Sequence, residues 1–429
     1  MNTNKFIKIA CALGMSLSVV ACASNNATEE KMNFEPGATV FESEDSPSGY
    51  MVHFAYQPEK EVKEVKVTGP FEYVDPNLDL HDEKNMYSPY EYKAGMYATN
   101  CAPGPFTWGY TENLTLNEET KTYELEFPIT SGSFAYSYIV TYEDGTEETI
   151  ADPANPSPAA ENTKSNIATG DITHSIVYGK FDEEKQAGSP NLDFVLKSDN
   201  KGTLEYVEYK GNLADDQDLG IYTPKGYDAN RKEPYQVVYM SHGGGGNETD
   251  WFAMGHADNI VANSSKDVIV VTMDNSSYEW DFEKIEDNVL NYIIPYVEAN
   301  YSVSKDAKDR AFCGLSMGSM TTFHMFYDHA TEFGYFGAYS GPDMTAIKEG
   351  APGTDTTPLY ITVGTCDIAS ANIMPNDDET KKKKYEDFKE YLEGHPMKNV
   401  IDGGYIKGSH DWFVWSQSFY TFLNDIAFK

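Results

Sequence analysis

The stretch "DRAFCGLSMGSMTTF", Asp309–Phe323, places a serine between two glycines, after a short apolar run and before a run of helical character. Glycines two residues before and two residues after Ser316 permit a cramped turn from a strand into a helix, with the hydroxyl exposed at the edge of a sheet. The amide N–H of Met317 then lies at the helix N-terminus, where it can face a developing oxyanion. The Gly-x-Ser-x-Gly pattern alone is a weak signal in a chain with 33 glycines. Its surroundings decide whether Ser316 is a nucleophile.

The residues around this stretch alternate between strand-like and helix-like segments. "YQVVYM" at 235–240 and "DVIVVTM" at 267–273 are continuous apolar runs, as expected of buried parallel strands. Residues 281–301 have the apolar spacing of a helix, 358–364 form another apolar run, and the chain closes on a helix-like segment. Repeated strand–helix units predict an α/β sheet flanked by helices, and we assign this domain to residues 185–429.

A serine hydroxyl needs a base, and in this architecture an acid and then a histidine follow the nucleophile along the chain. His395 and His410 are the histidines beyond the serine and its helix. His395 lies beside glycine and proline at a predicted helix end, where capping explains it. His410 lies in a loop before the last helix, which is where the base is expected.

The acid is expected directly after a buried strand. Asp367 follows the apolar run that ends in "PLYITVGTCD", a position suited to orienting an imidazole. Asp343, in "YSGPDM", is the competitor, and Asp411 is adjacent to the base and less suitably placed. The predicted catalytic residues are therefore Ser316, Asp367 and His410.

A glycine-rich loop, "SHGGGGNETDWF", follows the predicted strand at 235–240. Its four consecutive glycines let bare backbone approach a substrate carbonyl, so the second oxyanion donor is expected here. A phosphate-binding loop is the rival interpretation, but no Lys-Ser/Thr pair follows, and the spacing of a dinucleotide-binding turn is absent. His242 precedes the donor loop, and we expect a structural role for it.

The first half of the chain has a different pattern of apolar and polar residues. Apolar and polar residues alternate in runs such as 121–127, Asp144-Gly145 marks a hairpin, and no helical pattern of useful length interrupts these runs. These features predict an all-β sandwich at residues 37–184.

The end of this region, "YEDGTEETIADPANPSP", resembles the immunoglobulin-like module that precedes many glycan-active enzymes and is related to a starch-type carbohydrate-binding family. Trp108, Tyr110 and Tyr138 are able to stack on sugars. Packing inside the sandwich or against the second domain explains these three residues equally well.

Four motifs in order, "YMSHGGGGNETDWF", "CGLSMGSM", "ITVGTCD" and "GSHDWFVW", resemble the carbohydrate esterase family that contains feruloyl and acetyl-xylan esterases. The likeness covers about residues 202–429. It implies an α/β-hydrolase fold preceded by an all-β immunoglobulin-like sandwich domain. Ser319 stands where a further glycine is frequent, which leaves the five-residue serine pattern intact.

The same resemblance implies a role for each matching residue. Ser316 corresponds to the nucleophile, Asp367 to the acid and His410 to the base. The oxyanion hole would consist of the backbone N–H groups of Gly244 and Met317.

The resemblance further implies a serine esterase that acts on plant cell-wall polysaccharide without a metal or an organic cofactor. Feruloyl ester hydrolysis from xylan is the first expectation, and deacetylation of xylan is the close alternative, which needs a smaller pocket. An acyltransferase on a related fold and a surface glycan-binding lipoprotein with an inactive esterase domain are further alternatives. Candidates for an aromatic acyl or sugar pocket, several of which can equally be core residues, are Trp251, Tyr278, Trp280, Trp412 and Trp415.

Acidic residues outnumber basic ones by 68 to 32, which gives a formal net charge of -36. Such a surface repels phosphate backbones, so nucleic acid is not an expected partner. A neutral polysaccharide suffers no such repulsion, and solubility alone also accounts for the acidity.

The N-terminus has the pattern of an export signal. Lys5 and Lys8 precede an apolar run that is too short to span a membrane and that ends in "SVVAC". This ending resembles a bacterial lipoprotein signal, which implies a signal peptide at 1–22, lipid on Cys22 and a flexible polar tether at 23–36. A conventional secretory signal is the alternative. The expectation is an exported protein tied to a bacterial cell surface or outer membrane.

Overall fold

The computed structural model describes residues 34–80, 82–99, 109–158, 174–369 and 384–429. The predicted signal peptide with Cys22, most of the tether and Trp108 lie outside these residues. Pro36–Lys429 form one compact unit. Within the described ranges, no helix is both long enough and apolar enough to cross a membrane.

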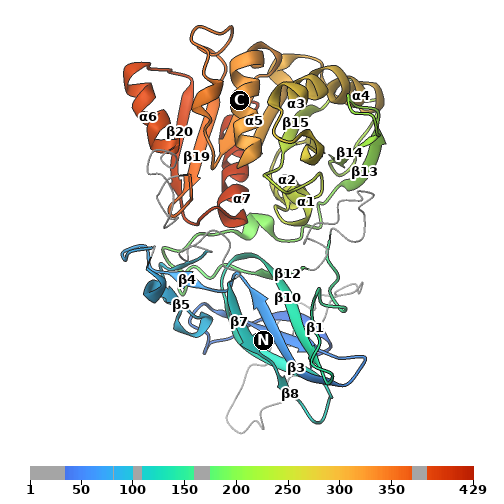
Figure 1. Ribbon diagram of the computed structural model, residues 1–429, viewed down its shortest axis with the longest axis vertical. Coiled ribbons are helices and arrows are strands. Elements are labelled where there is room, and N and C mark those ends of the chain that lie inside the picture. The colour runs from blue at the N-terminus through green and yellow to red at the C-terminus, as the bar shows by residue number, and fades with distance from the viewer. Residues whose placement is uncertain (1–33, 81, 100–108, 159–173, 370–383) are drawn as a thin grey trace, which may run out of the picture. The chain divides into compact units, whose positions relative to one another are not determined.

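The N-terminal part is built on two antiparallel sheets that share one core (Figure 1). One sheet has the order β1-β2-β9-β8, and the other has the order β11-β10-β3-β7, with β12 paired to β10. Phe54 of the first sheet meets Tyr136 of the second with ring centroids 5.0 Å apart, which confirms the predicted sandwich. The strands are β1 (Gly37–Glu42), β2 (Tyr50–Tyr56), β3 (Val62–Gly69), β7 (Tyr110–Asn113), β8 (Thr115–Leu116), β9 (Tyr123–Ile129), β10 (Gly132–Tyr142), β11 (Glu147–Ile150) and β12 (Ser175–Gly179).

The two sugar-stacking candidates that the structure describes pack inside this part of the chain. Tyr138 is fully buried and its hydroxyl faces Asp152, so its ring is not available to a sugar. Tyr110 packs edge-on against Phe127, with ring centroids 5.7 Å apart. Packing therefore accounts for both rings.

A small third sheet of order β5-β4-β6 interrupts the sandwich. Its strands are β4 (Tyr73–Val74), β5 (Met86–Tyr87) and β6 (Tyr97–Ala98). Strands of two residues are too short to show alternation, so the sequence did not indicate this sheet.

The C-terminal part is built on an eight-stranded sheet of order β13-β14-β16-β15-β17-β18-β19-β20. The pairs that β14 forms with β13 and β16 are antiparallel, and the remaining pairs are parallel. The strands are β13 (Thr203–Tyr209), β14 (Gln217–Thr223), β15 (Gln236–Ser241), β16 (Val268–Met273), β17 (Arg310–Leu315), β18 (Tyr335–Tyr339), β19 (Leu359–Gly364) and β20 (Val400–Ile406).

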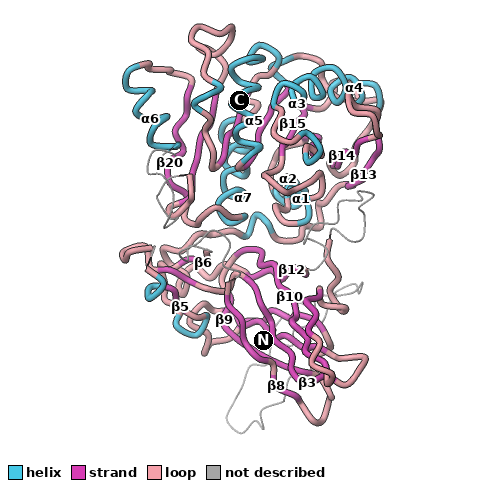
Figure 2. The backbone as a smooth tube through the Cα atoms, in the orientation of Figure 1, coloured by secondary structure: helices cyan, strands magenta, loops and turns pink. Residues whose placement is uncertain are grey.

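Helices cover both faces of this sheet (Figures 1 and 2). Its central strands, β15 to β19, are accordingly buried at nearly every position rather than at alternate ones. Val238 and Met240 of β15 join the core on one face, and Val237 and Tyr239 join the core on the other. The first face is covered by α1 (Asp250–Ala253), α2 (Ala257–Asn263) and α7 (Trp412–Thr421). The second is covered by α3 (Phe282–Asn288), α4 (Ile294–Asn300), α5 (Met317–His329) and α6 (Lys384–Gly394).

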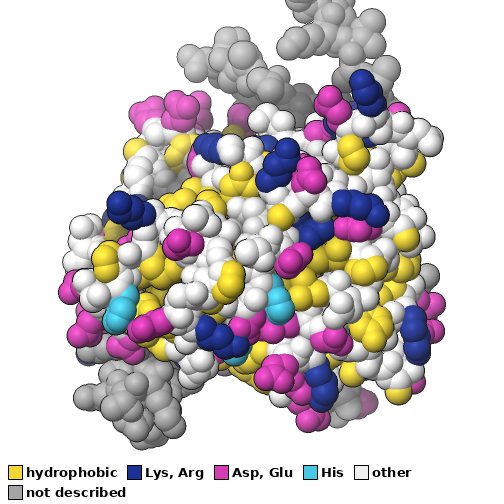
Figure 3. Space-filling model, turned by 90° about the horizontal axis from the view of Figure 1, so that it is seen from above, with side chains coloured by type: hydrophobic (Ala, Val, Ile, Leu, Met, Phe, Trp, Pro, Cys, Tyr) yellow, Lys and Arg dark blue, Asp and Glu magenta, His cyan; other side chains and the backbone are white. Residues whose placement is uncertain are grey.

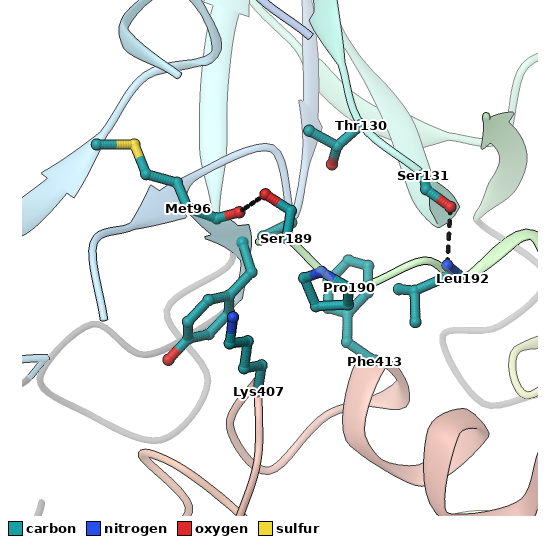
Figure 4. A pocket seen from close by; sticks show the side chains of 10 residues that line it. Met96, Thr130, Ser131, Ser189, Pro190, Leu192, Lys407 and Phe413 are labelled. Carbon is teal, nitrogen blue, oxygen red and sulfur yellow. Dashed lines mark hydrogen bonds between the residues drawn. The ribbon is translucent and has the colours of Figure 1, made fainter. Parts of the chain in front are cut away.

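The core of the sandwich continues into the C-terminal part. Phe413 of α7 belongs to the same apolar cluster as the sandwich residues, and its ring lies 5.3 Å from that of Phe134. Figure 4 shows Phe413 at a cavity of about 10 Å³, a volume that suits a single water molecule. The sandwich and the α/β part therefore meet through packed side chains.

Charged side chains of both signs are interspersed on the face shown in Figure 3, where Lys and Arg lie among Asp and Glu. On that face the acidity of the composition is not gathered into one patch.

Candidate active site

Ser316 lies at the turn between β17 and α5, with φ 52 and ψ -116. An L-residue rarely adopts this conformation, and the surroundings enforce it. The Ser316 amide N–H donates to the Tyr339 carbonyl oxygen at 2.9 Å. A Cβ on Gly314 would lie 2.3 Å from the Gly318 carbonyl oxygen, and a Cβ on Gly318 would lie 2.3 Å from the Ser241 carbonyl oxygen. Both glycines are therefore required for the turn to close.

The structure brings the three predicted catalytic side chains together from three separate loops. The distance from Ser316 Oγ to His410 Nε2 is 2.9 Å, and that from His410 Nδ1 to Asp367 Oδ1 is also 2.9 Å. Asp367 is fully buried, and its Oδ1 also accepts the amide N–H of Ala369 at 2.8 Å. With Nδ1 protonated toward the aspartate, the free lone pair of Nε2 faces the serine hydroxyl, as a general base requires.

The competing residues have other partners. His395 is exposed and pairs with Glu349. Asp343 accepts hydrogen bonds from Thr345 and faces His324, and Asp411 caps the N-terminus of α7 through the Val414 N–H.

The glycine loop lies against the nucleophile. A Cβ on Gly243 would lie 3.4 Å from Ser316 Cβ. His242 is buried and holds this loop, because Nε2 accepts the Asn275 N–H at 2.8 Å while Nδ1 donates to the Gly243 carbonyl oxygen at 2.6 Å. This histidine has both ring nitrogens engaged, which fits the structural role expected for it.

The two predicted oxyanion donors remain available. The Met317 N–H is the first of α5 and has no intrahelical acceptor. Among the described residues, the Gly244 N–H has no hydrogen-bond acceptor either. Free amides beside a nucleophilic hydroxyl are the groups that stabilise an oxyanion.

Comparison with known proteins places the chain in a family. Residues 211–426, half of the chain, match the family model "Esterase", whose description is "Putative esterase". The chain belongs to this esterase family. The α/β-hydrolase fold and the esterase family expected from the four motifs are thereby confirmed.

Curated relatives are matched over shorter stretches. An endo-1,4-beta-xylanase/feruloyl esterase from Xylanibacter ruminicola is 32% identical over 162 residues, which are 34% of this chain and 22% of the relative. Endo-1,4-beta-xylanase Y from Acetivibrio thermocellus is 29% identical over 202 residues, which are 43% of this chain and 17% of the relative. The chain thus spans about a fifth of the length of these relatives.

Solved structures are also similar to this chain. A CE1 ferulic acid esterase from Anaeromyces mucronatus, in complex with ferulic acid, is 21% identical with a TM-score of 0.42. The match covers 55% of this chain and 95% of that chain.

The aromatic residues predicted to line a pocket of the esterase domain divide into two groups. Trp280 is 53% exposed, and its Cζ2 atom would lie 3.2 Å from a Cβ on Gly244, so its ring stands beside the predicted oxyanion donor. Trp251 and Tyr278 lie in the core instead, at 0% and 3% exposure. The Trp251 indole donates to the Ser241 carbonyl oxygen, and the Tyr278 hydroxyl donates to side-chain oxygens of polar neighbours.

The two tryptophans of α7 also have packing roles in the esterase domain. Trp412 packs edge-on against Trp251 at 5.5 Å and against Trp415 at 5.1 Å. Trp415 is buried, its ring meets His410 edge-on at 5.1 Å, and its indole N–H donates to Ser340 Oγ. Trp415 therefore holds the imidazole rather than lining an open pocket.

Tyr97 of β6 and Thr99, which follows this strand, also support the site, and sequence reasoning missed both. The Tyr97 hydroxyl lies 2.8 Å from Oγ1 of Thr365, a residue two positions before Asp367. Thr99 Oγ1 donates to Asp411 Oδ2 at 3.3 Å, one residue after His410. Nothing in the local sequence around Tyr97 marks it as a partner of a loop more than 260 residues away.

Two cysteines lie near the catalytic loops of the esterase domain. Cys313 is a free, buried thiol in β17, and burial raises its pKa, so it is not a reactive nucleophile. Cys366, next to Asp367, is disulfide-bonded.

A cavity of about 430 Å³ lies away from the catalytic residues, between residues of β12, β13, α1 and α2. Its lining includes Tyr178, Tyr206 and Phe252 but no member of the predicted triad. The chemistry of the side chains, rather than the size of a hollow, therefore identifies the candidate site.

Proposed function

We propose that this protein is a serine esterase that hydrolyses feruloyl esters of plant cell-wall xylan. The observation that carries the proposal is the hydrogen-bonded chain from Ser316 Oγ through His410 to Asp367, at the strained turn of a chain that belongs to the esterase family. Two curated relatives are named as xylanases, and one of them also as a feruloyl esterase, which supports xylan as the polymer.

The reaction proceeds in two steps. His410 Nε2 takes the proton of Ser316 Oγ as this oxygen attacks the ester carbonyl carbon, and the N–H groups of Gly244 and Met317 stabilise the oxyanion. The imidazolium returns its proton to the sugar oxygen as the carbon–oxygen bond breaks, which leaves a feruloyl-serine. Water then attacks the acyl group by the same route, releasing ferulate and restoring the serine. Asp367 orients and stabilises the imidazolium throughout.

Trp280 favours the feruloyl group over the smaller acetyl group. Its ring is exposed beside Gly244, where it offers a flat apolar surface to an aromatic acyl chain. An acetyl group has no ring to stack on it. Acetyl-xylan deacetylation is the second candidate, because the same catalytic groups serve it equally well.

The test uses purified protein without residues 1 to 22, with methyl ferulate and acetylated xylan run in parallel. We expect ferulate release that falls by at least about 10⁴-fold in Ser316→Ala. Trp280→Ala is expected to raise KM for methyl ferulate and to leave acetate release unchanged. Acetate release alone would favour the second candidate, and activity unchanged in Ser316→Ala would contradict the proposed nucleophile.

Two further alternatives are separated by simple assays. A glycan-binding protein with an inactive esterase domain would not react with a serine-directed fluorophosphonate probe, whereas we expect labelling that is lost in Ser316→Ala. An acyltransferase would form a new ester when an acceptor alcohol is added, whereas we expect free ferulate as the main product.

We also propose that the protein is exported and anchored through lipid on Cys22, as its N-terminal sequence predicts. Fractionation of a bacterial host that expresses the full chain tests this. The protein is expected in the membrane fraction, and Cys22→Ser is expected to lose the anchor. Equal membrane association of both chains would contradict lipid attachment.

A further inference from the structure

A cluster of histidine and carboxylate side chains lies between α3 and α5, apart from the triad. Glu286 of α3 and His324 and Asp328 of α5 each place one metal-ligating atom such that all three atoms lie within 4.8 Å of one another. His324 and Asp328 are four residues apart, so they project from the same face of their helix. The two helices therefore supply converging nitrogen and oxygen donors.

Glu286 carries a polar atom without a partner. Its side chain is 8% exposed, and its Oε1 is buried with no hydrogen-bond partner among the described residues. His324 Nδ1 lies 4.0 Å from this oxygen, which is too far for a hydrogen bond. The other oxygen, Oε2, faces His329 Nε2 at 3.4 Å. A buried carboxylate oxygen without a partner is costly, and a bound cation would satisfy it.

His324 is held in the orientation of a metal ligand. Its Nε2 lies 3.3 Å from Asp343 Oδ2, and its ring stacks on Phe282 with centroids 4.4 Å apart. With Nε2–H donating to Asp343, the lone pair of Nδ1 faces Glu286. Histidines that bind metals commonly donate the other ring N–H to a carboxylate in this way.

Asp343 is suited to that supporting role. Its Oδ1 accepts hydrogen bonds from the Thr345 N–H at 2.9 Å and from the Thr345 hydroxyl at 2.7 Å. These bonds fix the carboxylate and leave Oδ2 to accept the ring N–H of His324.

We propose that Glu286, His324 and Asp328 bind a divalent transition-metal cation of the Zn²⁺ type. A mixed set of one imidazole nitrogen and two carboxylate oxygens suits zinc, whereas Ca²⁺ and Mg²⁺ prefer oxygen donors alone. Ligand atoms around tetrahedral zinc lie about 3.4 Å apart, so the cluster must contract slightly on binding. His324 and Asp328 are each 20% exposed, which leaves a path for the ion and a position for a water ligand.

Lys348 opposes the ion, because its ammonium group pairs with Asp328 Oδ1. The lysine side chain is 59% exposed and can move into solvent when a cation arrives. Its removal is therefore expected to strengthen metal binding, which is the reverse of the effect of losing a ligand.

The site would act on stability rather than on the reaction. His324 is eight residues along α5 from Ser316, which corresponds to about 12 Å of helix. The ion would connect α3 to α5, the helix whose N-terminus follows the nucleophile. Metal binding is expected to raise the melting temperature while ester hydrolysis changes less than twofold.

The experiment is calorimetric titration of Zn²⁺ into the EDTA-treated full chain. We expect one Zn²⁺ per chain, an affinity at least tenfold lower in Glu286→Gln and in His324→Asn, and a tighter site in Lys348→Met. His395→Asn is the matched control, because His395 is an exposed histidine that also pairs with a glutamate. The Zn²⁺ affinity of this variant should equal that of the wild type. Ca²⁺ should bind at least tenfold more weakly than Zn²⁺.

Thermal melts with and without Zn²⁺ accompany each titration, so that a folding defect in one variant is recognised. If His324→Asn does not fold, Glu286→Gln and Asp328→Asn provide the same comparison. The proposal would be overturned if the wild type did not bind Zn²⁺. It would also be overturned if the Zn²⁺ affinity changed less than twofold in folded variants of Glu286, His324 or Asp328. Neither result depends on the esterase activity of the protein.

Discussion

Ser316 and its two neighbouring glycines form the smallest unit of the site. The serine is held at φ 52 and ψ -116, and such a conformation costs about 1–3 kcal/mol. Hydrogen bonding of its amide to Tyr339 and close packing at Gly314 and Gly318 hold it there. The strain keeps the hydroxyl directed at His410 rather than into the helix.

Gly318→Ala should remove both activity and stability. The new Cβ would lie 2.3 Å from the Ser241 carbonyl oxygen and 2.7 Å from that of His242, so the turn and the glycine loop must separate. We expect a loss of about 2 kcal/mol or more in the free energy of unfolding and a fall in kcat/KM of at least about 100-fold. Denaturant unfolding and ferulate release measure the two effects. Gly394→Ala is the control, because nothing lies within 4 Å of its Cβ position, and it should change neither quantity appreciably.

Glu248, in the glycine-rich segment, is the second residue with an unusual environment. Its side chain is fully buried, and neither carboxylate oxygen has a hydrogen-bond partner among the described residues. Burial raises its pKa from 4.5 to about 8, so the folded protein keeps a proton that the unfolded chain has released. Folding stability from this group is therefore fully present below pH 4.5 and is lost as the pH rises toward 8.

Glu248→Gln should remove that pH dependence. Each pKa unit corresponds to about 1.4 kcal/mol, so the variant is expected to be more stable than the wild type by a few kcal/mol near pH 9. The two proteins should be equally stable near pH 4.5. Denaturant unfolding of both across this range measures the difference, and a constant difference at all pH values would contradict the buried, protonated state.

At the scale of an element, the start of α7 sets the position of the base. Asp411 caps the helix by accepting the Val414 N–H at 3.2 Å, and its other oxygen accepts the Ser409 N–H at 3.1 Å. His410 lies between these two anchored residues. The hydrogen bonds of Asp411 therefore cap α7 and position the His410 imidazole at the same time.

Asp411→Ala should damage both functions of this cap. Loss of an N-cap costs about 1–2 kcal/mol, and we expect kcat to fall while KM stays nearly constant, because the base shifts without a change in substrate contacts. Asp411→Asn retains the acceptor oxygen for Val414 and should recover most of the stability. Urea unfolding and steady-state kinetics test both variants. A normal kcat in a destabilised Asp411→Ala would show that the cap does not position His410.

At the scale of the whole molecule, the N-terminal part of the chain contacts the catalytic loops directly. Tyr97 reaches Thr365 and Thr99 reaches Asp411, on either side of the acid and the base. Phe413 of α7 belongs to the sandwich core. The N-terminal part therefore supports the active site in addition to any contact it makes with substrate.

Phe413→Ala should weaken this connection. Removal of a buried phenylalanine costs about 3 kcal/mol or more, and the wild type is expected to unfold in one calorimetric transition because the two parts share a core. The variant should unfold at lower temperature, with the sandwich and esterase transitions separated. Tyr292→Ala is the control, since Tyr292 is 37% exposed. Independent melting of the two parts in the wild type would contradict the shared core.

The sequence by itself indicated the repeated strand–helix units of the C-terminal part, the sandwich of the N-terminal part and the identity of the candidate catalytic residues. The nucleophile turn is local, since five consecutive residues and their glycines define it. Asp367 and His410 were identified because each follows a strand at the expected place in chain order, and their positions relative to Ser316 match this expectation. Continuous apolar runs at β15 and β16 likewise indicated a sheet buried on both faces.

Only the tertiary structure decided which aromatic residues are exposed and which contacts support the site. Trp251, Tyr278 and Tyr138 are buried, although the sequence alone made each of them a candidate for contact with a ligand. The cluster around Glu286 unites residues of two helices without a recognisable zinc-ligand spacing. Burial and contacts of this kind depend on segments that are distant along the chain, so local patterns do not encode them.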